Sequence, residues 1–147
     1  MGNVVDYREL AIDELKKLKQ YYAAEKIIKS RITELDACLK SIGGKTRGAS
    51  TKDGGGNETE NKWVNIISNI SDEEERLKRV TCAIKRVDLA LSAVSDEEAK
   101  FLRWAYVEGA GIDNFAQTEH MGTRIVYRLR KRALINFARA FFGAVVT

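Results

Sequence analysis

The chain has 147 residues, a formal net charge of +4 and no proline. This length leaves room for one domain, or for a small domain with a helical extension, and the lack of a long apolar run excludes a membrane-spanning segment. The N-terminal residues also lack the apolar block of a secretion signal, so we expect a cytoplasmic protein. The absence of proline and the abundance of good helix formers predict an all-α fold.

The positive charge is concentrated in the C-terminal third of the chain. Residues 100–147 have a formal balance of +5, whereas residues 1–99 have a balance of −1. This asymmetry indicates that a basic surface for binding an anionic partner lies in the C-terminal part of the chain, and that the protein is not basic throughout.

Residues 4–42 repeat apolar side chains with a helical period and predict a first long helix. The next fifteen residues, 43–57, include six glycines and predict a flexible loop. Lys45, Arg47 and Lys52 are candidate phosphate contacts within it. However, its Gly-Lys-Thr sequence lacks the glycine spacing of a nucleotide-binding loop, so a tether between helices is the favoured interpretation.

A strict heptad pattern runs from about Glu58 to Val94, with Glu73 as its one polar interruption. The apolar heptad positions are Trp63, Ile66, Ile70, Leu77, Val80, Ile84, Val87, Leu91 and Val94. We expect one continuous helix, because the spacing runs without a slip through a capping-box sequence at 71–74. It is predicted to fold back on residues 4–42 as a long antiparallel, coiled-coil-like hairpin, and any apolar face left over predicts a homodimer through that hairpin.

A second domain is predicted from Ser95 to the C-terminus, so that residues 1–94 form the hairpin and residues 95–147 a separate module. Ser95 and Glu98 have the spacing of a capping box and predict a helix that ends near Gly109. A short helix is expected at 112–119, then a turn at 120–122. The last helix is expected at 123–142, where basic residues occur without any Asp or Glu.

The two last helices and their turn predict a trihelical helix-turn-helix domain. Ala116 is small enough for close helix approach, Met121 would fill the gap at the turn, and the β-branched Val126 follows Ala116 by ten positions. His120 stands where the turn needs a left-handed backbone, which histidine tolerates better than most residues.

The outward positions of the last helix predict contact with double-stranded DNA. Arginines there can read guanine or clamp phosphate, and their absence of acidic neighbours favours an anionic partner. An acidic membrane surface fits poorly, because the apolar stripe is needed for the trihelical core. The candidate DNA-binding residues are Thr123, Arg124, Tyr127, Arg128 and Lys131 on the groove-facing side, with Arg130 and Arg132 beside them.

No enzyme motif is present, so we expect no catalytic activity, cofactor or metal site. Cys38 and Cys82 match no metal-ligand spacing and are predicted to be reduced core residues. His120 has no companion ligands in the sequence. The tryptophans, Trp63 and Trp104, are predicted to be core or interface anchors.

The sequence also resembles a known group of regulators. VYRLRKRAL at 126–134, together with Phe115-Ala116 and Ser95-Asp96-Glu97-Glu98, resembles region four of bacterial sigma factors. The further segments VDYRELAIDELK, KRVDLALSAVSDEE and Ala140-Phe141-Phe142-Gly143 extend the likeness to phage and prophage regulators of Gram-positive bacteria of the ArpU and RinA type. The turn departs from the sigma pattern, with Glu119-His120 for Leu-Gly and Gly122 for the usual capping Ser or Thr.

The resemblance implies a sequence-specific DNA-binding regulator of phage or prophage transcription that acts with host RNA polymerase in the bacterial cytoplasm. Two alternatives stay open from the sequence. One is a phage DNA-packaging component similar to a small terminase subunit, which joins a helix-turn-helix to coiled-coil helices. The other is an interaction module whose helix-turn-helix binds protein.

Overall fold

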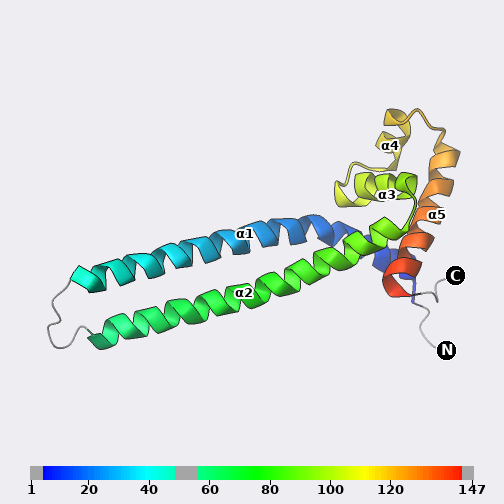
Figure 1. The fold of residues 1–147 in the computed structure, drawn as a ribbon. Coiled ribbons are helices and arrows are strands. Elements are labelled where there is room, and N and C mark those ends of the chain that lie inside the picture. Colours follow the sequence, from blue (N-terminus) through cyan, green and yellow to red (C-terminus); the bar gives the residue numbers. More distant parts are fainter. Residues whose placement is uncertain (1–4, 49–55, 144–147) are drawn as a thin grey trace. The chain divides into compact units, whose positions relative to one another are not determined.

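The computed structural model describes residues 5–48 and 56–143, and all regular secondary structure in these ranges is helical. The predicted all-α fold is therefore confirmed. No helix within the described ranges is both long enough and apolar enough to cross a bilayer. In chain order the elements are α1 (Tyr7–Gly48), α2 (Gly56–Ala93), α3 (Asp96–Leu102), the π-helical turn η1 (Arg103–Val107), α4 (Ile112–Thr118) and α5 (Thr123–Phe142) (Figure 1).

The described residues form two compact units whose boundaries lie inside the long helices. The first unit, called here the C-terminal unit, comprises the residues up to Tyr22 and those from Cys82 onward. The second, called the hairpin unit, comprises the residues from Ala23 to Thr81. This grouping differs from the expected division between residues 94 and 95, which stays a prediction.

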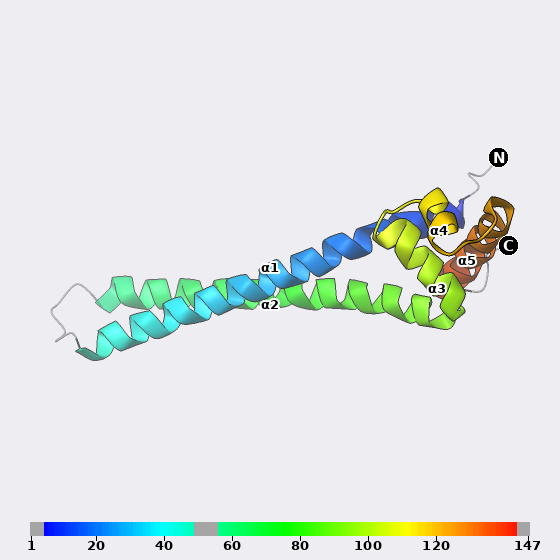
Figure 2. The same ribbon diagram turned by 90° about the horizontal axis from the view of Figure 1, so that it is seen from above.

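In the hairpin unit, α1 and α2 run antiparallel (Figures 1 and 2). Apolar residues at heptad spacing form the seam between the two helices, and most of them are half-buried. Glu73 occupies one seam position and is buried, and its Oε1 accepts a hydrogen bond from Arg76 Nη1 at 2.7 Å. Arg31 of α1 lies 3.9 Å from the same oxygen, so the charged seam residue has partners on both helices.

Several local predictions for these helices can be compared with the structure. The α2 helix continues through residues 71–74, as the heptad spacing predicts. The loop expected at 43–57 is helical at both ends, because α1 extends to Gly48 and α2 begins at Gly56. The structure does not describe the rest of that predicted loop, residues 49–55. The candidate phosphate contact Lys52 lies in this part.

The prediction that the cysteines are core residues was wrong. Both Cys38 and Cys82 are exposed, free thiols, because each occupies a helix position outside the buried stripe. Trp63 is also exposed, to 47 %, and is not a core anchor within the chain.

The C-terminal unit contains nearly all of the buried apolar side chains. Figure 1 shows α3 and α5 beside one another, and residues of these two helices are in contact. Phe101 of α3 packs edge-on against Phe115 of α4, with ring centroids 5.2 Å apart. The α5 residues that face this core are Val126, Leu129, Ala133, Leu134, Phe137 and Ala138.

The beginning of α1 belongs to this same core. Ala11, Leu15 and Leu18 are fully buried, at the three- and four-residue steps of one helix face. The Tyr7 ring lies 5.4 Å from that of Phe142, at the end of α5. The first turns of α1 therefore support the same unit as the C-terminal helices.

Replacing Leu15 by alanine should lower the free energy of unfolding of the C-terminal unit by about 2–5 kcal/mol, because it removes a fully buried side chain. Leu10→Ala is the matched control, since Leu10 lies on the same helix and is 40 % exposed; its effect should stay within about 0.5 kcal/mol. Urea unfolding followed by Trp104 fluorescence in a Trp63→Phe background measures both. Equal effects of the two substitutions would contradict the assignment of α1 to this core.

Candidate nucleic-acid interface

The α4–α5 connection is a tight turn held by backbone geometry. The Met121 N–H donates to the Ala116 carbonyl at 2.9 Å, which draws the turn back onto α4. Ala116 and Val126 are buried and Met121 is half-buried, so the three residues predicted to close the helix pair all face inward.

The turn contains the one non-glycine residue with positive φ in the described ranges. His120 has φ of 54°, the left-handed conformation expected of it from the sequence. Gly122 is the N-cap of α5, and among the described residues no side-chain hydrogen bond caps the start of this helix. The first turn of α5 also contains no acidic residue, so no carboxylate there neutralises the positive end of the helix dipole.

The five residues predicted to face DNA share one exposed side of α5. All are exposed, and the Tyr127 side chain, for example, is 49 % exposed. Within the described residues, the guanidinium groups of Arg124 and Arg128 and the Lys131 ammonium form no ion pair or hydrogen bond. The exposed, outward residues are Thr123, Arg124, Tyr127, Arg128 and Lys131.

The other two candidate residues are bound within the protein. Arg130 is half-buried, and its Nε donates a hydrogen bond to Tyr106 Oη at 2.7 Å. Arg132 donates from Nε to Glu98 Oε1 at 3.1 Å, and its Nη2 lies 3.7 Å from Glu97 Oε2. Arg132 keeps 57 % of its side chain exposed, but its charge is already paired.

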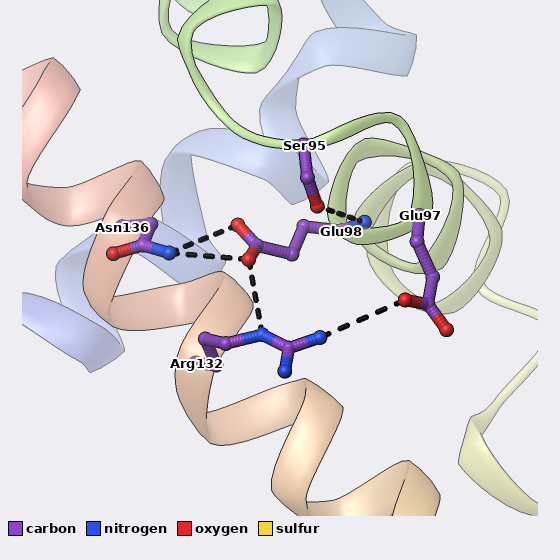
Figure 3. A network of polar contacts seen from close by, with 5 residues as sticks. All are labelled: Ser95, Glu97, Glu98, Arg132 and Asn136. Carbon is purple, nitrogen blue, oxygen red and sulfur yellow. Dashed lines mark hydrogen bonds and ion pairs between the residues drawn. The ribbon is translucent and has the colours of Figure 1, made fainter.

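Glu98 is the centre of a polar network between α3 and α5 (Figure 3). Its side chain is only 6 % exposed, and Asn136 Nδ2 donates to both carboxylate oxygens, at 3.2 and 3.0 Å. The Ser95 side chain caps α3 by accepting from the Glu98 N–H at 3.2 Å, which confirms the predicted N-cap. A buried carboxylate that accepts three hydrogen bonds from Arg132 and Asn136 fixes the position of α5 against α3.

Sequence reasoning missed two features of this surface. The role of Asn136 has no signal in the sequence, because its partner Glu98 lies 38 residues away. Ile125 was not assigned to any face, yet its side chain is 54 % exposed on the first turns of α5.

No cluster of three or more metal-ligating side chains occurs in the described parts of the chain. Comparison with protein families, curated proteins and solved structures found no match to this chain.

Removing the Asn136 amide should destabilise the C-terminal unit, because the buried Glu98 carboxylate loses two hydrogen bonds. We expect Asn136→Ala to lower the free energy of unfolding by about 1.5–3 kcal/mol in urea titrations. The control is Asn114→Ala on the exposed side of α4, with a change within about 0.5 kcal/mol. Stability unchanged by Asn136→Ala would show that the network does not hold α5 in place.

The left-handed turn gives a second stability prediction. His120→Gly should leave stability unchanged or raise it by up to about 1 kcal/mol, because glycine adopts positive φ without a Cβ penalty. His120→Val should lower it by more than about 1 kcal/mol, since a β-branched residue is strained there. The midpoint of thermal unfolding of both variants tests this prediction. A higher midpoint for His120→Val than for the unmodified protein would contradict the positive φ of residue 120.

Proposed function

We propose that the chain is a sequence-specific DNA-binding regulator of phage or prophage transcription, similar to sigma factor region four and acting with host RNA polymerase. The observation that supports this proposal is the single exposed face of α5 that presents Arg124, Arg128 and Lys131 without intramolecular partners. Exposed, unpaired cations on one face of a helix suit the repeated phosphates of a nucleic-acid backbone.

The geometry of α5 suits the major groove of duplex DNA, which admits one α-helix. The outward residues occupy its first half, the part of a recognition helix that contacts base edges. Arg124 and Arg128 are four residues apart on one face and can each bind guanine through two hydrogen bonds. The uncapped first turn adds N–H donors that favour a phosphate oxygen.

The intramolecular contacts divide the seven candidate residues into two roles. Thr123, Arg124, Tyr127, Arg128 and Lys131 form the proposed DNA-contacting face. Arg130 and Arg132 are instead proposed to orient that face, because their guanidinium groups bind Tyr106 and Glu98. No catalytic step is part of this proposal, and the site of action is the cytoplasm of the bacterial host.

The double substitution Arg128→Ala with Lys131→Ala tests the proposed face. The duplex ligand is first recovered from a random-sequence pool by rounds of selection on the unmodified protein. Fluorescence anisotropy should then show affinity reduced by about tenfold to a hundredfold at 0.1 M salt, because two cationic contacts are lost. The slope of log K against log salt should fall in magnitude by about 2.

The matched control is Lys26→Ala with Lys40→Ala, which removes the same charge from exposed positions on α1. Its salt slope should equal that of the unmodified protein. The proposal fails if selection enriches no sequence, or if both double variants lose affinity to the same extent.

A further inference from the structure

The hairpin unit buries its own apolar seam only in part. Among its described residues, only Ile28 and Glu73 are buried. The remaining seam residues are half-buried, namely Ile32, Leu35, Leu39, Ile42, Ile66, Ile70, Leu77 and Val80. Partial exposure of this kind is ordinary for a seam between two helices, so the seam by itself does not call for a partner.

A strip of large apolar side chains lies exposed beside the seam. Trp63, Val64 and Ile67 of α2 are 47 %, 63 % and 50 % exposed. Apolar side chains gathered in this way mark an interaction surface rather than ordinary solvent-facing helix.

Next along α2, the charge reverses abruptly. Residues 72–75 are all acidic, and three of the next four, 76–79, are basic. Within the described residues, the ion pairs of this segment are those of Glu73 with Arg31 and Arg76. The order would also suit intrahelical pairs four residues apart, such as Glu74 with Lys78, but no such pair lies within 4 Å.

The apolar strip and the central charges lie on one side of α2. At 3.6 residues per turn, Trp63, Ile67, Glu74 and Lys78 fall within an arc of about 60°. All four are exposed. The side chains therefore form a continuous surface with an apolar end and an acidic-to-basic reversal.

We propose that this surface of α2 binds the same surface of a second copy of the chain, antiparallel, with the two-fold axis midway between Glu74 and Lys78. In this register Glu74 lies opposite Lys78 of the second copy, and Lys78 opposite its Glu74. A surface whose charge sequence reverses sign about one point is complementary to itself only in the antiparallel orientation. Parallel, in-register pairing would place Glu74 against Glu74, with like charges opposed.

In this register the apolar strip faces residues 85–89 of the second copy, among them Leu89, which is 69 % exposed. Self-complementarity favours a second copy over an unrelated partner, because one helix supplies both halves of the charge pattern. This inference is independent of DNA binding and needs no property of α5.

Charge exchange at Glu74 and Lys78, measured by sedimentation equilibrium on the full chain, tests the pairing. Glu74→Lys should weaken the dimer by about tenfold, because two opposed ion pairs become two repulsive pairs. Lys78→Glu should do the same. The double exchange, Glu74→Lys with Lys78→Glu, should restore the affinity, and a mixture of the two single variants should form a heterodimer.

The control is Asp36→Lys, an equal charge change at an exposed position of α1, which should leave the dimer unchanged. Circular dichroism verifies that each variant keeps its helix content. A monomeric unmodified protein up to about 100 µM, where even weak specific association is populated, would overturn the proposal. Single variants that dimerise as well as the unmodified protein would overturn it too.

Orientation is measured by pulsed electron spin resonance between identical labels on the two copies, in a Cys38→Ser, Cys82→Ser background. A label at Glu75→Cys lies near the axis and should give a separation below about 25 Å. A label at Lys62→Cys, fourteen residues from the axis, should give roughly 40 Å, because each residue adds 1.5 Å on both copies. Equal separations at the two positions would indicate parallel pairing and contradict the proposal.

Discussion

Glu98 places a carboxylate in the interior of the C-terminal unit, and the rest of that unit depends on how the charge is satisfied. Asn136 binds both oxygens, and Arg132 binds one of them. An unpaired carboxylate at this depth would cost several kcal/mol, so α5 is stable only in the position that supplies these donors. The same position buries the apolar stripe of α5 and leaves Arg124, Arg128 and Lys131 in solvent.

The contact with Glu98 also gives different roles to basic residues of α5 that cannot be told apart from the sequence. The sequence of α5 contains six basic residues and does not show which of them are paired. In the structure Arg132 binds the buried Glu98 carboxylate, and Arg130 binds the Tyr106 hydroxyl. The proposed DNA surface is consequently smaller than the basic character of α5 indicates. It is also better defined, because the paired arginines hold the helix that presents it.

Periodicity and local signals were sufficient to predict much of the helical structure. The last helix was expected at 123–142 and occupies Thr123–Phe142, and the Ser95 cap and the left-handed His120 are present. Each of these features depends on residues within a few positions of one another. The packing of Leu15 with the C-terminal unit and the Glu98–Asn136 contact join residues far apart in the chain, which periodicity does not reveal.

The two proposals are compatible. A dimer through α2 has two copies of α5, and dimeric DNA-binding proteins commonly read two half-sites of one operator. The ArpU and RinA resemblance and the partnership with RNA polymerase stay proposals.

The most direct test of the central claim is site-specific photo-cross-linking of the full chain to its selected duplex. Benzoylphenylalanine at Tyr127 lies on the proposed face of α5, whereas the same group at the exposed Trp63 lies on α2. We expect a covalent protein–DNA product from position 127, located within the selected site, and none from position 63. Cross-linking absent from position 127 while binding is retained would contradict the assignment of this face to DNA.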